Sequence, residues 1–369
     1  MKQHLQKIDF LRGIAILMVF VFHSESALYP DFLVLTYKQN GIINAPGVKS
    51  LILNLSPPAF GWTGVTLFFI ISGFLIHLGY LRNQDSFSIR TFYSKRFWRI
   101  FPAYWLALFF FCFCTGGFWL YFFYRTGFEN FVLHVFALHN LLPATFYTIN
   151  PSYWSIAVEV QLYLIYPVLL YVRKRIGIGK TFILILLLSL TTLMLEIIFD
   201  NKNVFGYRYS VIEFWFEWAA GAYMAEAYFN DKRILKNAGL LISLLLLLLL
   251  IPGKYFVYTN YFLIYIATLS WVIFIDWLLG NKKIKMESRF SKLIINIGLC
   301  SYSIYLIHQP FLFDMVNFFN IISNKHLTRI LNIVPAFAVI FLISWSLYQY
   351  VELPSVAFGN KLRKRKENQ

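Results

Sequence analysis

Two polar side chains, Arg12 and His23, interrupt the first apolar stretch of the chain. At about 100° per residue in an α-helix, their spacing puts both within about 20° of one face, roughly 16 Å apart along the axis. A guanidinium binds anions such as phosphates, and an imidazole exchanges protons near neutral pH. One helix face therefore combines an anion-binding group with an acid–base group, unless Arg12 only anchors the helix end and His23 lies in an outer loop.

A carboxylate and a second histidine occur in later apolar stretches. Glu159 follows Trp154 and Ser155 and shares a helix face with Ser155 and Tyr163 through their i±4 spacing. A carboxylate in such surroundings usually has a partner or a function, so Glu159 is a candidate for the chemistry. His308 is as compatible with a buried, hydrogen-bonded structural role as with a catalytic one.

Arg96 and Arg99 lie three residues apart, so one helical turn would put both guanidinium groups on one face, where they suit phosphates. The alternative is anchoring of a cytoplasmic loop at the membrane surface. Small residues at 61, 64, 72 and 73 predict close approach of another helix or of a ligand. Glu213 and Glu217 share a helix face, and we interpret them as structural.

The composition defines the elements that must position these groups. Hydrophobic residues make up 59% of the 369 residues, charged residues 14%, and the net charge is +16. Soluble domains are about 45–50% apolar and about 25% charged, so the composition disfavours a soluble enzyme, a nucleic-acid-binding protein and a disordered chain. Long apolar runs without strand-type alternation predict an all-α, polytopic transmembrane helical bundle.

About ten spans are expected. Their ranges are 8–27, 60–80, 101–123, 152–172, 180–199, 207–228, 237–252, 259–279, 293–312 and 330–351. Most of the 33 Lys and Arg residues fall in alternate loops, which predicts that both termini are cytoplasmic. We expect a membrane domain over residues 1–355 and a basic cytoplasmic tail over residues 356–369.

Two segments between the spans have separate interpretations. The apolar run within 128–143 is too short to span and is interpreted as an interfacial or re-entrant helix. The segment Leu28–Ala59 is expected on the outer side. The three cysteines lie in apolar runs without metal-type Cys/His spacing, so neither a disulfide framework nor a metal is expected.

This orientation predicts a site with two ends. The groups expected in the outer half are His23, Glu159 and His308. The groups expected on the inner side are Arg12, Arg96 and Arg99. A charged, phosphate-bearing donor would enter from the cytoplasm, and proton transfer would take place near the outer surface.

These residues resemble acyltransferase family 3, the integral membrane O-acyltransferases that modify bacterial surface polysaccharides. The resemblance covers residues 5 to 355 and follows the order of the family's motifs. The motifs are Arg12-x10-His23, Phe68-Phe69-Ile70-Ile71-Ser72-Gly73-Phe74-Leu75, Arg96-x-x-Arg99-Ile100-x-Pro102-x-Tyr104, Trp154-Ser155-x-x-x-Glu159-x-x-x-Tyr163, Ser301-Tyr302-Ser303-x-Tyr305-Leu306-x-His308-x-Pro310 and Glu352-x-Pro354.

The resemblance implies a multi-pass protein of the bacterial cytoplasmic (inner) membrane. It implies acetyl-CoA or a related acyl-CoA as the donor, and an extracytoplasmic acceptor such as a lipid-linked glycan or lipopolysaccharide O-antigen. It also implies that Arg12 and His23 are needed for activity. Many members carry an acidic residue where this chain has Thr66, so any role of that acid is absent or moved here.

Transfer from a thioester to a hydroxyl requires a base, a stabilised oxyanion and a bound donor. Our hypothesis makes His23 the general base, while Glu159 orients it or holds the acceptor. The donor-binding candidates are Arg12, Arg96, Arg99 and Ser72. The candidates for acceptor binding or support are Trp154, Ser155, Tyr163 and His308.

Two other functions fit some of the same residues. Intramembrane His, Glu and Arg also mark the pathway of a proton-coupled small-solute transporter or exporter, although no internal repeat supports this. A non-catalytic scaffold in glycan assembly would not need His23. Binding of acetyl-CoA separates the enzyme from the transporter.

Overall fold

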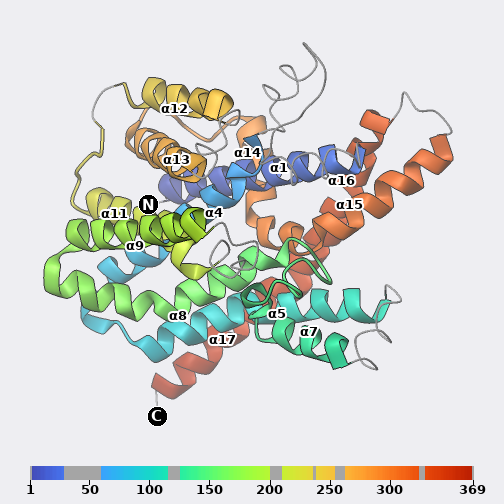
Figure 1. Cartoon of the computed structure of the whole chain (residues 1–369), viewed down its shortest axis with the longest axis horizontal. Helices are drawn as coiled ribbons and strands as arrows, with labels where there is room; N and C mark the ends of the chain where they lie inside the picture. Colours follow the sequence, from blue (N-terminus) through green and yellow to red (C-terminus); the bar gives the residue numbers. More distant parts are fainter. Residues whose placement is uncertain are drawn as a thin grey trace. The chain divides into compact units, whose positions relative to one another are not determined.

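The computed structural model describes residues 2–28, 60–114, 125–199, 210–235, 238–253, 262–323 and 329–367. This part of the chain is built from helices and contains no β-strand, which confirms the all-α prediction for it (Figure 1). All but the first residue of the predicted outer segment Leu28–Ala59 lies outside the described residues. The same holds for parts of four predicted spans, at 115–123, 207–209, 237 and 259–261.

The helices follow one another in a simple order along the chain. They are α1 (Lys2–Leu28), α4 (Thr63–Arg82), α5 (Ile89–Cys114), α7 (Arg125–Val135), α8 (Tyr153–Ile176), α9 (Ile178–Phe199), α11 (Val211–Phe229), α12 (Gly239–Gly253), α13 (Leu263–Gly280), α14 (Arg289–Leu299), α15 (Ser301–Ser323), α16 (Arg329–Leu347) and α17 (Leu353–Glu367). Three short turns of other helix types are η2 (Gln84–Ser86), η3 (His139–Leu141) and the π-helical η6 (Tyr348–Glu352).

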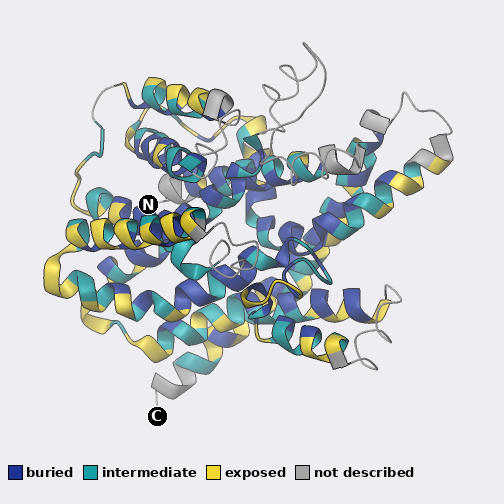
Figure 2. Cartoon of the chain, in the orientation of Figure 1, coloured by how far each residue is buried: buried dark blue, intermediate teal, exposed yellow. Residues whose placement is uncertain are grey.

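Among the described residues, 6 helices are long and apolar enough to cross a membrane, or up to 7 if the bent pair α14 and α15 forms one span. Exposed leucine and isoleucine side chains on α9 and α12, such as Leu187 and Leu248, suit contact with lipid (Figure 2). The total of about ten spans and the cytoplasmic position of both termini stay predictions.

Two elements differ from the sequence-based expectation. The predicted span 293–312 is two helices, which meet at Cys300 with a bend of 76°. Helix α5 begins at Ile89 and not near residue 101, so Arg96 and Arg99 lie inside a helix and not in a loop. Hydropathy reports where a helix enters an apolar environment and does not report where its backbone hydrogen bonding begins.

The apolar run within 128–143 forms α7, of 11 residues, followed by η3. A spanning helix needs about 20 residues, so α7 is too short to cross. This agrees with its interpretation as an interfacial or re-entrant element.

The chain divides into two compact units, each assembled from segments that are far apart in the sequence. Unit 1 comprises Met1–Leu81, Glu217–Ser301 and Pro310–Phe341. Unit 2 comprises Arg82–Phe216, Tyr302–Gln309 and Leu342–Gln369. Each unit is described by itself below, and the predicted division after residue 355 stays a prediction.

Pairs of helices in unit 1 cross at glycine residues, where no side chain separates the two backbones. A Cβ atom on Gly73 of α4 would overlap the backbone carbonyl of Trp218 in α11, and one on Gly221 would overlap that of Ile70. Helices α1 and α14 cross in the same way at Gly13 and Gly298. Small residues in the second span therefore do admit a second helix at close range, as the sequence predicts.

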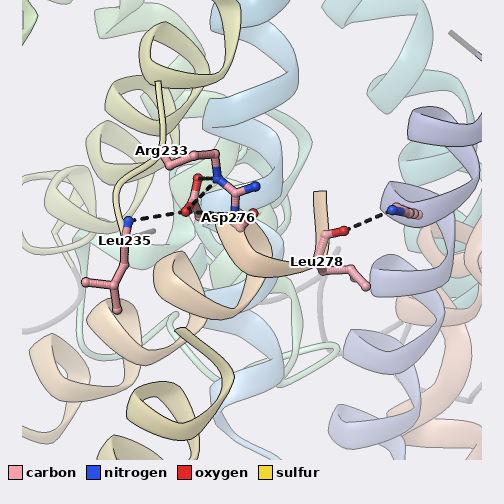
Figure 3. Close-up of polar contacts among 5 residues, drawn as sticks. Arg233, Leu235, Asp276 and Leu278 are labelled. Carbon is pink, nitrogen blue, oxygen red and sulfur yellow. Dashed lines mark hydrogen bonds and ion pairs between the residues drawn. The ribbon is translucent and has the colours of Figure 1, made fainter. Parts of the chain in front are cut away.

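Polar contacts in unit 1 join α1, the connection after α11 and the end of α13 (Figure 3). Lys7 of α1 donates to the carbonyl oxygens of Leu278 (2.9 Å) and Asn281 (2.8 Å), which belong to the last turn of α13 and the residue after it. Arg233, in the connection after α11, forms an ion pair with Asp276 (3.1 Å). The start of α1, this connection and the end of α13 therefore lie together, as expected for segments on one side of a membrane.

Unit 2 is organised around α5. Tyr93 of α5 donates a hydrogen bond to the carbonyl of Leu164 in α8 (2.9 Å), and the rings of Tyr104 and Tyr153 pack 5.1 Å apart, so α5 and α8 are antiparallel. Helix α17 also packs on α5, where Gly359 leaves room for the indole of Trp98.

Helix α7 is held on α5 by hydrogen bonds to its last carbonyls. Tyr104 donates to the carbonyl of His134 (2.7 Å), and Trp105 donates to that of Val135 (2.9 Å). The His134 ring stacks on His139 at 3.8 Å, and both side chains are fully buried. Burial lowers the pKa of His134 to about 4 and outweighs two contacts of its ring with backbone carbonyls.

Substitution of Gly73 by leucine is expected to destabilise the protein by about 1–3 kcal/mol or more, because the new side chain meets the backbone of α11. Gly79→Ala in the same helix is the matched control, since nothing lies within 4 Å of a Cβ there. Thermal unfolding of the detergent-solubilised variants measures both. Equal unfolding midpoints for the two variants would contradict the close crossing.

The burial of His134 predicts loss of stability in acid. Its pKa is about 4 in the folded protein, below the ordinary value of 6.5, so the folded state favours the neutral ring. The neutral His134 ring therefore adds about 3 kcal/mol to the free energy of unfolding above about pH 6.5. This contribution decreases as the pH falls toward 4. In unfolding measured between pH 7.5 and 4.5, His134→Gln should have a shallower pH dependence than the wild type; identical slopes would refute this assignment.

Candidate active site

The helix face predicted from Arg12 and His23 lies in unit 1, on α1. Arg12 is paired with Asp9 one turn earlier, with 3.6 Å between Nη1 and Oδ1, and the arginine side chain is 17% exposed. His23 is half-buried, eleven residues further along the same helix. Our sequence reasoning missed Asp9, although its i, i+3 spacing from Arg12 is a signal for this ion pair.

Helices α4 and α11 share a buried carboxyl group in the same unit. Thr66 donates a hydrogen bond to Oε1 of Glu217 (3.0 Å), and Glu217 is fully buried. Oε2 of Glu217 accepts no hydrogen bond from the residues that the structure describes. Thr66 of α4 therefore lies beside a carboxyl group that α11 supplies.

Helix α4 also contacts α1. A Cβ on Gly64 would lie 2.6 Å from the carbonyl oxygen of Ala15, and Thr66 is two residues further along α4. The Thr66–Glu217 pair is therefore close in sequence to the point where α4 meets the middle of α1. Glu217, which the sequence analysis treats as structural, joins the candidate site.

Ser72 takes part in the contact between α4 and α11. Its hydroxyl accepts a hydrogen bond from the indole of Trp218 (3.3 Å). Five residues further along α4, His77 lies 3.0 Å from Oε1 of Glu226, so a second polar contact joins the same two helices. This packing role favours Ser72 as a residue that holds α4 on α11, and its predicted part in donor binding stays a prediction.

In unit 2, Arg96 and Glu159 are joined through one tyrosine. The Arg96 guanidinium lies 5.5 Å from the ring centre of Tyr163 and 5.8 Å from that of Phe92. The Tyr163 hydroxyl donates to Oε1 of Glu159 one turn earlier on α8. Nε of Arg96 is buried and makes no hydrogen bond within the described parts of the chain.

This arrangement corrects the separation expected between an inner and an outer end. The sequence assigns Arg96 to the cytoplasmic end and Glu159 to the outer half, yet a single side chain separates the two groups. The reason is that α5 is already helical at Arg96 and runs antiparallel to α8, so its first turns pack beside the middle of α8.

Arg99 has a different environment from Arg96. Its Nη1 lies 2.6 Å from Oε1 of Glu352, which is fully buried in η6. The other oxygen of Glu352 accepts a hydrogen bond from Ser303 of α15 (2.7 Å). The contact with Arg99 is an ion pair without hydrogen-bond geometry, because the charges are close but the guanidinium N–H does not point at the oxygen.

The acceptor-side candidates Ser155 and Trp154 are packed inside unit 2. Ser155 shares a hydrogen bond of 2.6 Å with the hydroxyl of Tyr305 in α15. Trp154 stacks on Phe146, with ring centres 5.8 Å apart. Both contacts hold the start of α8 in place, which is a supporting role.

His308 is fully buried, and its Nδ1 lies 2.9 Å from the carbonyl of Tyr305 in its own helix. This local bond favours the structural alternative for His308. Asn150 donates to the carbonyl of Leu306 (2.9 Å) and accepts from the hydroxyl of Ser152 (2.7 Å). Asn150 therefore fastens α15 to the start of α8, and it was not recognised in the sequence because no periodic pattern includes it.

The predicted residues thus form two groups. Unit 1 holds Arg12, His23 and Ser72, with Asp9 and Glu217 added by the structure. Unit 2 holds Arg96, Arg99, Trp154, Ser155, Glu159, Tyr163 and His308, with Glu352 and Ser303 added. Within the described ranges, no cluster of three or more His, Cys, Asp or Glu side chains is placed to hold a metal ion.

Chemically, these groups suit recognition of an anion and transfer of a proton. Unit 2 presents two arginines on adjacent turns of one helix, one over aromatic rings and one paired with a carboxylate. Unit 1 presents an imidazole on α1 and a buried carboxyl group between α4 and α11.

Comparison with known proteins identifies the family. A family model described as "Acyltransferase domain" matches residues 5–349. The chain is 28% identical over 150 residues to a protein of Haemophilus influenzae described as uncharacterized, and the alignment covers 38% of this chain and 61% of that protein. The match thus spans less than two thirds of that relative's length. No solved structure matches the chain.

The family match includes the α1 face with Arg12 and His23, the arginines of α5, the Glu159 turn of α8 and the α15 segment with Ser303. Because it extends over nearly all of an apolar, helical chain with several potential membrane spans, the chain belongs to acyltransferase family 3, a family of membrane acyltransferases.

Proposed function

We propose that the protein transfers an acetyl group from cytoplasmic acetyl-CoA to a hydroxyl of an extracytoplasmic surface glycan, such as lipopolysaccharide O-antigen. The protein would act in the bacterial inner membrane. The observation that carries this proposal is Arg96, whose buried Nε has no hydrogen-bond partner among the described residues and whose guanidinium rests on the Tyr163 ring. A cation held in this way is suited to a phosphate-bearing donor.

Arginine binds phosphates through a planar fork of N–H groups and stacks on aromatic rings. Phe92 and Tyr163 fix the plane of the Arg96 guanidinium without neutralising its charge. Arg99 follows one turn later, with its side chain 30% exposed. Together they provide two positive groups for the phosphates of CoA, while the flexible pantetheine arm carries the thioester further into the protein.

In the transfer step, the oxygen of the sugar hydroxyl attacks the thioester carbonyl carbon. The C–S bond breaks, CoA leaves as a thiolate that takes up a proton, and the hydroxyl proton passes to the base. We assign the base to His23, because an imidazole accepts protons near neutral pH. Arg12 would lie along the thioester route, and Glu159 would hold the acceptor or orient the base.

Substitution of His23 by glutamine is expected to abolish transfer of radiolabel from acetyl-CoA to extracytoplasmic glycans in membranes. The amide keeps the polarity and approximate size of the ring but does not accept a proton, so a loss of at least about 100-fold is expected. His134→Gln, the same change at a histidine outside the candidate site, serves as the control for a histidine substitution. Full activity of a correctly folded His23→Gln protein would refute the assignment.

Arg96→Ala is expected to raise KM for acetyl-CoA about ten- to hundredfold, the effect of losing hydrogen bonds to a charged group. Arg96→Lys should recover only part of the loss, because lysine keeps the charge but not the planar fork. With acetyl-pantetheine, which lacks the nucleotide phosphates, the variants should resemble the wild type. An equal loss with both donors would contradict phosphate recognition by Arg96.

The transporter hypothesis makes a different prediction for the wild-type protein in these assays. A proton-coupled transporter has no reason to bind acetyl-CoA or to transfer its acyl group. Absence of both binding and transfer would therefore favour transport, whereas binding without transfer would point to another acceptor or acyl chain.

A further inference from the structure

Glu352 connects three elements of unit 2 that are distant in the sequence. It lies in the π-helical turn η6 and is 1% exposed. One carboxylate oxygen is 2.6 Å from Arg99 of α5, and the other accepts a hydrogen bond from Ser303 of α15 (2.7 Å). One oxygen of the carboxylate is thus in an ion pair and the other in a hydrogen bond, so contacts from α5 and α15 together define its position.

The ion pair leaves part of Arg99 available. The Arg99 side chain is 30% exposed, while Glu352 on its inner side is buried. A guanidinium has five N–H donors, and the contact with Glu352 involves Nη1. The other N–H donors are not in contact with Glu352 in this ion pair, and Arg99 lies one helical turn from Arg96.

Two like charges on adjacent turns of a helix repel each other, and long side chains in that situation turn toward water. The negative charge of the buried Glu352 carboxylate offsets this repulsion, and its ion pair with Arg99 restrains the position of the Arg99 guanidinium. The π-helical turn is a rare geometry that is frequent at functional sites. Helix α17, directly after it, is anchored on α5 by the contact of Phe358 with Trp98, whose ring centres are 4.9 Å apart.

We propose that Glu352, supported by Ser303, is a positioning residue that holds Arg99 beside Arg96, so that both arginines meet the phosphates of the acyl donor. This inference rests on the proposed function, since it assigns a role within the same donor site. Glu352 itself does not touch the donor in this arrangement. It acts through Arg99.

Glu352→Gln tests the proposal, because it keeps the size of the side chain and removes its charge. The matched control is Asp276→Asn in unit 1, where Arg233 is also 30% exposed and the acid is 6% exposed (Figure 3). Steady-state transfer from acetyl-CoA gives KM and kcat, and thermal unfolding gives the stability of each variant. Ser303→Ala, which removes one hydrogen bond from Glu352, is a milder second variant.

We expect Glu352→Gln to raise KM for acetyl-CoA about tenfold, with kcat close to that of the wild type and with normal KM for acetyl-pantetheine. Ser303→Ala should shift KM in the same direction by a smaller factor, and Glu352→Asp should restore part of the loss. Asp276→Asn should lower the unfolding midpoint and leave KM unchanged.

A purely structural role would give a different pattern. If Glu352→Gln and Asp276→Asn lowered the unfolding midpoint alike and neither changed KM, the proposal would be overturned. If Glu352→Gln did not fold, an unchanged KM for Ser303→Ala would overturn it in the same way. Failure of the wild type to use acetyl-CoA at all would instead refute the proposed function, so the two failures are distinguishable.

Discussion

The cost of burying charge among apolar helices is the constraint on which the rest of this structure depends. A carboxylate or guanidinium removed from water loses several kcal/mol unless a partner of opposite charge or a set of hydrogen bonds replaces the solvent. Glu352 and Asp276 each meet an arginine, and Glu217 receives the hydroxyl of Thr66. These contacts decide which helices lie together, because each joins segments that are far apart along the chain.

Packing of small residues makes those contacts possible. Lipid provides little hydrophobic drive for one helix to join another, so close van der Waals contact and polar bridges carry the association. In unit 1, Gly73 and Gly221 bring α4 and α11 to backbone distance, and the Thr66–Glu217 bond lies along the same crossing. The buried hydrogen bond between Thr66 and Glu217 thus depends on the close helix packing that Gly73 and Gly221 allow.

The two arginines of α5 show how similar sequence positions acquire different tasks. Arg96 is supported by aromatic rings and has a buried donor without a hydrogen bond among the described residues, whereas Arg99 is held by a carboxylate. In the function that we propose, the first group is oriented by stacking and the second by charge. Both devices reduce the freedom of a long side chain before a ligand arrives, which is the physical meaning of preorganisation.

Composition and periodicity alone determined that this chain is a helical membrane protein, and the order of its motifs pointed to its family. These properties are readable because burial in lipid demands long apolar runs, and because helical spacing alone places Arg12 and His23 on one face. The tertiary structure decided the partners: Glu217 beside Thr66, Glu352 behind Arg99, and Tyr163 between Arg96 and Glu159. Local sequence does not encode these pairings, because each depends on which helices cross and at what depth.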